Sequence, residues 1–320
     1  MSKVPKNFFQ LAGDFGFDSL DSQGIDGLEE LRGLGFHGVY PQDLFCTINR
    51  GDDDTQILFE SKEERLQTRS ESEVEAFAKA VSSKGLTLES SHFNQTLQPP
   101  GEPVEWIFPR HEALVNLANV AGLDRITTHI GWMYGLVASE YTGSAAKDFA
   151  SGAISLRGLH LTAREAYGGL DAIRKNSLTI YRNLCDEAAK YGITVTVETS
   201  CIEVLEINTK GDEIRDFIKD VGRDNLAVCL DPGHCLWNGV SPVDLARDLG
   251  SLIVETHFHD NNGDHDSHMP LGTGSIDWLG LAKVMLNFGY KGIITFEQKK
   301  HATNMQNWFQ VLEQIEQNGN

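Results

Sequence analysis

The sequence predicts a single-domain α/β protein, residues 1–320, in which eight parallel strands and the helices between them form a (β/α)8 TIM barrel. Short runs rich in β-branched residues alternate with longer amphipathic segments along the whole chain. Eight such pairs fit the length of this barrel, and neither a linker nor an internal repeat divides the chain. An open, doubly wound sheet is the alternative that the same alternation allows.

Strands are expected where β-branched residues cluster. In chain order they are Phe9–Ala12, Gly38–Tyr40, Leu86–Ser91, Arg125–His129, Thr194–Glu198, Leu226–Leu230, Ile253–His257 and Gly292–Phe296. Amphipathic segments predict helices at 24–34, 71–84, 108–121, 163–191, 209–221, 242–250, 278–288 and 304–317.

Local signals mark several helix ends. Ser70-Glu-Ser-Glu73 and Thr162-Ala-Arg-Glu165 fit a capping box, and Ser241-Pro242 fits an N-cap followed by proline. Residues 133–162, rich in Gly, Ala and Ser, form an unusually long connection. Such a loop indicates a lid, a binding loop or a contact within a homo-oligomer.

Composition argues against several classes of protein. The 27 basic and 46 acidic residues give a formal net charge of −19, which repels polyanions, so no nucleic-acid partner is expected. No apolar run approaches the roughly 20 residues of a membrane span. The N-terminus, MSKVPKNFFQ, lacks the apolar stretch of a secretory signal, and the five cysteines lack framework spacing. We therefore expect a cytoplasmic protein with no membrane partner.

Ligand-type residues recur at the ends of six consecutive predicted strands, where a barrel of this kind has its active site. They are His92, His129, Glu198, Asp231, His257 and Glu297. Core packing does not explain six such residues, because burying unpaired acids costs free energy. Their mixed oxygen and nitrogen donors suit a divalent metal ion, Mn²⁺, Mg²⁺, Co²⁺ or Zn²⁺.

A second set of ligand-type residues accompanies the first. His234 lies three residues after Asp231, and the segment Asp266-Ser-His268-Met-Pro-Leu-Gly-Thr-Gly274 follows the seventh strand. These side chains suit either substrate binding or additional metal ions. Glu198 and Glu297, on the fifth and eighth strands, would flank a metal that polarises a substrate carbonyl, and would move protons.

The chain resembles the xylose isomerase-like TIM-barrel superfamily, most specifically over residues 193–298. This superfamily holds sugar and sugar-phosphate isomerases and epimerases, inosose dehydratases and family-2 AP endonucleases. The resemblance implies a metal site formed by Glu198, Asp231, His257 and Glu297. It also implies that the two glutamates are the acid/base pair, and that His234 contacts substrate or binds metal.

The resemblance implies a metal-dependent isomerase or epimerase of a carbohydrate: a sugar, a sugar phosphate or a keto-polyol. The reaction would pass through an enediolate. A lyase of the inosose dehydratase kind would use the same enolate and lose a β-hydroxyl, and the sequence does not separate the two. Residues 258–270 lack the arginine that many ketose epimerases carry there, so the substrate need not be a ketose.

The AP endonuclease branch, with three zinc ions, is a further alternative. By residue type the chain fills all its zinc positions, including His92, His129 and the segment 266–274. Around His92, in Asp231-Pro-Gly-His234 and in the segment after His257, the sequence departs from the endonuclease motifs. These departures and the net charge count against DNA cleavage. A barrel that binds ligand without chemistry is the non-enzymatic alternative.

Overall fold

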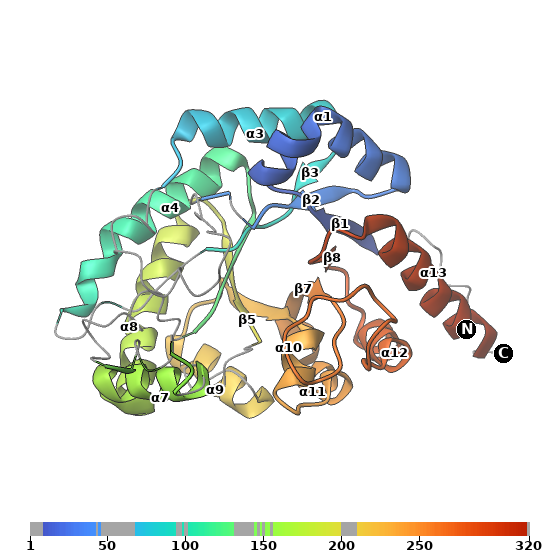
Figure 1. Cartoon of the computed structure of the whole chain (residues 1–320). Helices are drawn as coiled ribbons and strands as arrows, with labels where there is room; N and C mark the ends of the chain where they lie inside the picture. Colours follow the sequence, from blue (N-terminus) through green and yellow to red (C-terminus); the bar gives the residue numbers. More distant parts are fainter. Residues whose placement is uncertain are drawn as a thin grey trace.

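The computed structural model describes residues 9–42, 44–45, 68–93, 98, 102–130, 144–145, 148, 151–153, 156–199 and 210–318. In this part of the chain, helices surround a sheet of eight parallel strands (Figure 1). The predicted TIM-barrel architecture is therefore confirmed. No helix among these residues is both long and apolar enough to cross a bilayer.

The strands lie close to their predicted positions. They are β1 (Gln10–Asp14), β2 (Gly38–Tyr40), β3 (Thr87–Leu88), β4 (Arg125–Thr128), β5 (Thr194–Glu198), β6 (Leu226–Leu230), β7 (Ile253–Phe258) and β8 (Ile293–Phe296). Their order in the sheet is β3-β2-β1-β8-β7-β6-β5-β4.

A parallel bridge between His92 and Thr127 joins the two ends of this order. The backbone N–H of Phe93 donates to the carbonyl of Thr127 at 2.6 Å, and the N–H of Thr127 donates to the carbonyl of Ser91 at 3.0 Å. The segment after β3 therefore pairs with β4. This pairing favours a closed barrel over the open, doubly wound alternative.

The helices lie outside the strands (Figure 1). They are α1 (Phe17–Leu34), α3 (Glu71–Ser83), α4 (Phe108–Ala121), α7 (Leu156–Tyr167), α8 (Gly169–Ala189), α9 (Gly211–Val221), α10 (Pro232–Trp237), α11 (Pro242–Leu249), α12 (Trp278–Phe288) and α13 (His301–Asn318). Two short 3-10 turns, η2 (Val104–Ile107) and η3 (Gly250–Leu252), precede α4 and β7.

Two of the three predicted helix caps are confirmed. The Ser70 hydroxyl accepts the N–H of Glu73 at 3.3 Å, and the Glu73 carboxylate accepts the N–H of Ser70 at 2.8 Å. Ser241 caps α11. The capping box predicted to begin at Thr162 is wrong, because this residue lies inside α7 and its hydroxyl donates to the carbonyl of Gly158 at 3.1 Å.

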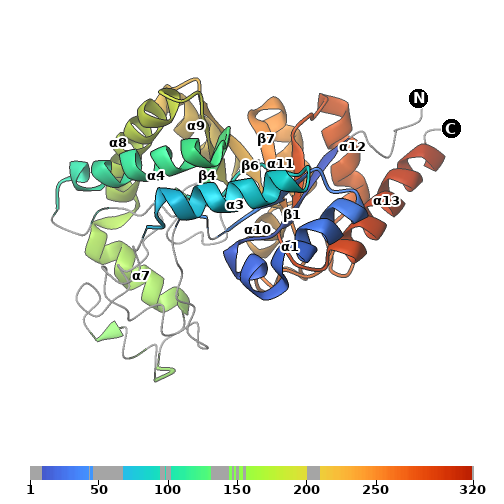
Figure 2. The same cartoon turned by 90° about the horizontal axis from the view of Figure 1, so that it is seen from above.

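The single helix predicted over residues 163–191 is two helices, α7 and α8. Gly168 separates them and Gly169 begins α8, with φ of +101° and +84°, values that residues with a side chain rarely adopt. Figure 2 shows α7 beyond the end of α8, away from β1 and β7. The lid or subunit contact predicted for residues 133–162 falls largely outside the described residues.

Alternation along the strands separates the apolar core from a polar interior. On β5, Val195 and Val197 belong to the hydrophobic cluster between strands and helices. Thr196 and Glu198 point the other way, and the Thr196 hydroxyl bonds to the Glu255 carboxylate inside the barrel at 2.9 Å. The fold thus places Glu198, a predicted site residue, in a buried interior.

Stability should depend on pH through His111 on α4. This imidazole is fully buried beside Asn183, at 2.7 Å, and burial lowers its pKa from 6.5 to about 4. Between these values the unfolded chain binds a proton that the folded protein does not, so stability falls as the pH drops through the window. In His111→Gln, the free energy of unfolding should therefore fall by about 3 kcal/mol less than in the wild type when the pH drops from 7 to 4.

The measurement is the free energy of unfolding in urea between pH 7 and pH 4. His265→Gln, which replaces a histidine whose side chain is 67% exposed, is the control. It should leave the change of unfolding free energy with pH as it is in the wild type. Equal slopes for wild type and His111→Gln would contradict the expectation.

Candidate active site

The predicted site residues lie at the carboxyl ends of the strands. Glu198 is the last residue of β5, and Asp231 and Glu297 directly follow β6 and β8. His257 lies one residue before the end of β7, and His129 directly follows β4. Since all strands are parallel, these side chains meet at one rim of the barrel.

Four residues form an inner cluster, defined as His92, Glu198, His257 and Glu297, whose ligand atoms lie within 4.8 Å of one another. The Nδ1 atom of His257 is 3.1 Å from Oε2 of Glu198 and 3.7 Å from Oε2 of Glu297. The Nε2 atom of His92 is 3.3 Å from an oxygen of each glutamate. His129 adjoins the cluster, with its Nε2 3.4 Å from Glu198. Two carboxylates thus converge on shared imidazoles.

Asp231 lies between this cluster and a second one. As the N-cap of α10, it accepts the backbone N–H of His234 at 2.8 Å. Its other oxygen lies 3.0 Å from Nε2 of His259. Asp231 therefore groups with Glu198 and His234 on one side, and with His259 and Glu297 on the other. The four ligands implied by the resemblance are spread over neighbouring groups that share the two glutamates.

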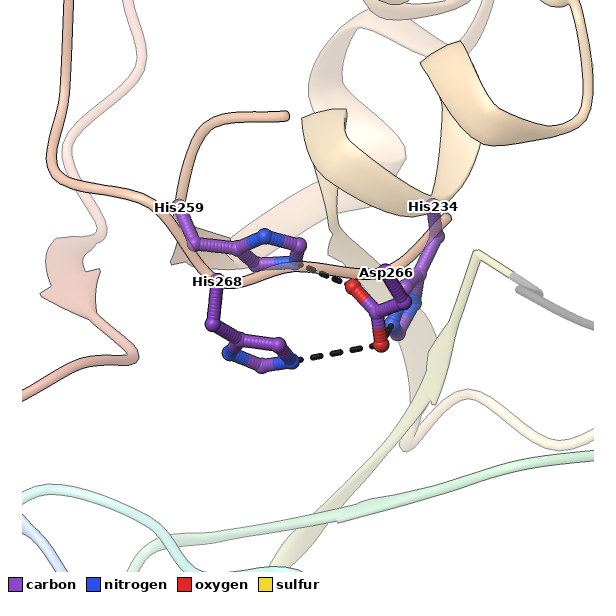
Figure 3. A group of neighbouring side chains, drawn as sticks. All are labelled: His234, His259, Asp266 and His268. Carbon is purple, nitrogen blue, oxygen red and sulfur yellow. Dashed lines mark hydrogen bonds and ion pairs between the residues drawn. The ribbon is translucent and has the colours of Figure 1, made fainter. Parts of the chain in front are cut away.

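Figure 3 shows an outer cluster, defined as His234, His259, Asp266 and His268. It adjoins the inner cluster, because Nδ1 of His234 lies 3.2 Å from Oε1 of Glu198. Asp266 lies among the three imidazoles, with its oxygens 3.2 Å from His268, 3.4 Å from His234 and 3.5 Å from His259. The rings of His259 and His268 stack with centroids 3.9 Å apart. His268 has a φ of +43°, and strained backbone of this kind concentrates at functional sites.

Imidazoles hold the inner carboxylates in the ionised form. Burial alone would raise the pKa of Glu198, but His257, His129 and His92 outweigh it and hold that pKa well below its usual range. Burial also acts on Glu297, yet His257 and His92 lower its pKa to about 2. Both glutamates therefore carry negative charge near neutral pH and require a positive partner.

In the outer cluster, too, neighbouring charges and hydrogen bonds outweigh the effect of burial on the pKa values. Burial would raise the pKa of Asp266, but its hydrogen bonds with His234 and His268 lower it far below the usual range. Burial would lower the pKa of His268, whereas Asp266 and Glu297 raise it to about 10. Asp266 and His268 thus form an ion pair at the rim.

The inner cluster fits a divalent metal ion. Both ring nitrogens of His257 are buried and face acids: Nδ1 lies 3.1 Å from Glu198, and Nε2 lies 3.6 Å from Glu255. The buried carboxylates of Glu198 and Glu297 lie within 4.8 Å of each other and repel. A cation between Glu198, Glu297 and Nδ1 of His257 would relieve this repulsion. The donor set suits Mn²⁺, Mg²⁺, Co²⁺ or Zn²⁺.

Asp260 organises the loop that carries Asp266 and His268. Its carboxylate is fully buried. It accepts four hydrogen bonds, from the backbone N–H groups of Asn261 (3.0 Å), Gly272 (2.9 Å) and Ile276 (3.3 Å) and from the indole of Trp278 (2.9 Å). These bonds tie both arms of the loop to one charge and so fix the outer cluster.

The prediction from sequence omitted His259 and Glu255 from the site. Both lie two residues from His257, and alternate residues of a strand face the same side, so this spacing was an available signal. Gly233 was another signal, because a Cβ there would lie 2.0 Å from the His259 ring. The glycine in Asp231-Pro-Gly-His234 thus makes room for the second imidazole.

The fold and these clusters define a TIM-barrel protein with a candidate metal centre at the strand ends. Comparison with known proteins narrows the class. A family model described as xylose isomerase-like TIM barrel matches residues 51–317, and the chain belongs to this family.

Individual relatives are similar to this chain only over part of its length or at low sequence identity. D-psicose 3-epimerase of Agrobacterium fabrum is 32% identical over 103 residues, which are 30% of this chain and 34% of that protein. The chain spans less than half the length of the curated relatives it matches. A solved D-allulose 3-epimerase from Methylomonas sp. has a TM-score of 0.64 at 15% identity, covering 96% of this chain and 97% of that one. A family-2 AP endonuclease from Brucella melitensis has a TM-score of 0.59 at 15% identity, covering 94% and 98%.

The role of Asp260 can be measured by stability. We expect Asp260→Ala to lower the free energy of unfolding by about 3 kcal/mol, because buried donors lose a charged acceptor. Asp264→Ala, an exposed position in the same loop, should change it by less than about 0.5 kcal/mol. Chemical denaturation of both variants gives the comparison, and similar effects would refute the organising role.

Proposed function

We propose that this protein is a divalent-metal-dependent isomerase or epimerase of a carbohydrate: a sugar, a sugar phosphate or a keto-polyol. The observation that carries the proposal is the pair of buried, ionised carboxylates, Glu198 and Glu297, that converge on His257. Such a pair can remove a proton from a substrate carbon and return one. The sugar epimerases among the relatives support the substrate class.

The residues proposed to hold the metal are Glu198, Asp231, His257 and Glu297. When bound, the ion would supply Lewis acidity that polarises a substrate carbonyl and acidifies the neighbouring C–H. Glu198 and Glu297 are the acid/base pair: one takes a proton from the substrate carbon and gives an enediolate, and the other, once it has taken up a proton from solvent, returns a proton to carbon. Gln42 donates to Oε1 of Glu297 at 2.9 Å and so orients that carboxylate.

The remaining site residues are proposed to bind substrate hydroxyls or an additional metal. His129 and His92 approach Glu198 from the β3 and β4 side, and His234 approaches it from α10 at 3.2 Å. Asp266 and His268 complete the outer rim. Donors from both sides suit a substrate that carries several hydroxyl groups.

The reaction type can be tested in deuterated water. Purified protein with Mn²⁺ is incubated with ketoses, ketose phosphates and keto-polyols. Isomerisation or epimerisation should introduce deuterium beside the carbonyl, detected by NMR. Dehydration by an inosose dehydratase-like route would instead give an enone that absorbs in the ultraviolet.

Substitution tests the acid/base pair in the same assay. We expect Glu198→Gln and Glu297→Gln each to lower turnover by at least about 100-fold, the usual contribution of a general acid or base. Glu112→Gln, exposed on α4, is the matched control and should leave the rate unchanged. Intact turnover in Glu297→Gln would show that the assignment is wrong.

Metal-dependent phosphodiester hydrolysis is the second candidate function. The outer cluster favours it, because its three imidazoles and one aspartate provide ligands for ions beyond one at the inner cluster. The net charge of −19 opposes binding of a nucleic acid.

Metal analysis separates the two candidates. We expect about one divalent ion per chain, retained in His268→Gln and lost in Glu198→Gln, with no cleavage of DNA that contains an abasic site. Additional ions, one of them lost in His268→Gln, together with cleavage of that DNA, would favour the phosphodiesterase. A protein that binds no divalent ion would support the non-enzymatic alternative.

A further inference from the structure

A polar layer lies directly beneath the metal-ligand layer inside the barrel. Each of its members precedes a site residue by two positions, so it faces the same interior one step deeper. These residues are Ser90, Thr127, Thr196 and Glu255, which precede His92, His129, Glu198 and His257. Three of the four carry hydroxyl groups, and the fourth is an acid.

Glu255 is the centre of this layer. It is only 2% exposed. Its Oε2 accepts the hydroxyls of Thr127 at 2.8 Å and Thr196 at 2.9 Å, and its Oε1 accepts the hydroxyl of Ser90. Hydroxyl donors from three strand segments thus converge on one carboxylate, which offsets much of the cost of burying its charge.

The same carboxylate lies behind the imidazole of His257. Oε1 of Glu255 is 3.6 Å from Nε2 of His257, whereas the other ring nitrogen, Nδ1, is 3.1 Å from Glu198. The two nitrogens of the ring therefore lie next to different acids. A carboxylate behind a ligating histidine determines which nitrogen carries the hydrogen and which offers a lone pair.

We propose that Glu255 is a positioning residue for the metal centre. It keeps Nε2 of His257 protonated and directed into the barrel, so that Nδ1 presents its lone pair to an ion between Glu198 and Glu297. The inference rests on the proposed metal dependence. It assigns the polar layer a function, which is to fix the orientation of one ligand.

The first test measures metal affinity with Mn²⁺ alone as the probe, by isothermal titration calorimetry. Glu255→Gln should bind Mn²⁺ roughly 10- to 100-fold more weakly than wild type, as expected when the partner of a ligating histidine is lost. Unfolding temperatures in EDTA show whether the variant still folds. Equal affinity in a folded Glu255→Gln would overturn the inference.

A matched pair of variants keeps Glu255 in place. Thr127→Val removes one hydroxyl that donates to Glu255 and should weaken Mn²⁺ binding several-fold. Thr128→Val changes the adjacent residue, whose buried hydroxyl has no partner in the described part of the chain, and should have no effect. Equal effects of the two would overturn the inference, because they would reflect general packing.

A spectroscopic readout tests the orientation itself. In the Zn²⁺-bound protein, nitrogen-15 NMR should show His257 with Nδ1 coordinated and Nε2 protonated, assigned with His257→Gln. Coordination through Nε2 would overturn the inference. Cys229, Glu255 and His257 also form a group that could hold a metal ion. Thiolate absorption from the Co²⁺-loaded protein would show that the ion binds there, with Glu255 as a direct ligand, and would likewise overturn the inference. A wild-type protein without Mn²⁺ affinity would overturn the metal centre itself.

Discussion

Buried negative charge is the constraint on which this structure depends. Five carboxylates are buried in the described part of the chain: Glu198, Asp231, Glu255, Asp260 and Glu297. An uncompensated buried acid costs several kcal/mol, so each needs a partner. Asp260 and Glu255 are compensated by N–H and hydroxyl donors. Glu198 and Glu297 face imidazoles instead, so their stability depends on positive charge, whether of protonated rings or of a metal ion.

The kind of partner that each buried acid has depends on how deep the acid lies in the barrel. Three hydroxyl groups donate to the deeper acid, Glu255, and these bonds fix the geometry of its carboxylate beside His257. Titratable rings surround the acids at the rim, where a substrate could reach them. Strand alternation produces this arrangement without special backbone geometry, because Thr196 and Glu198 face the same interior two residues apart on β5.

Local sequence signals predicted the parts of the fold that depend on nearest neighbours. The bounds of β5 and β6 were predicted to the residue, since β-branched runs end there against polar or turn residues. Contacts distant in sequence account for the rest. β3 is shorter than predicted, and residues 91–93 pair with β4 instead, a partner that no local pattern reveals. His259 meets Asp266 and His268 because Asp260 holds the following loop, and Gly233 leaves space for the His259 ring.

The bridge between His92 and Thr127 gives the barrel a seam that coincides with the site. His92 belongs at once to the pairing that closes the sheet and to the inner cluster on Glu198 and Glu297. Separation of the seam would therefore carry an imidazole away from both glutamates. A ligand bound by His92 and the two glutamates would connect the two sides of this seam, so that ligand binding and closure of the barrel would be thermodynamically linked.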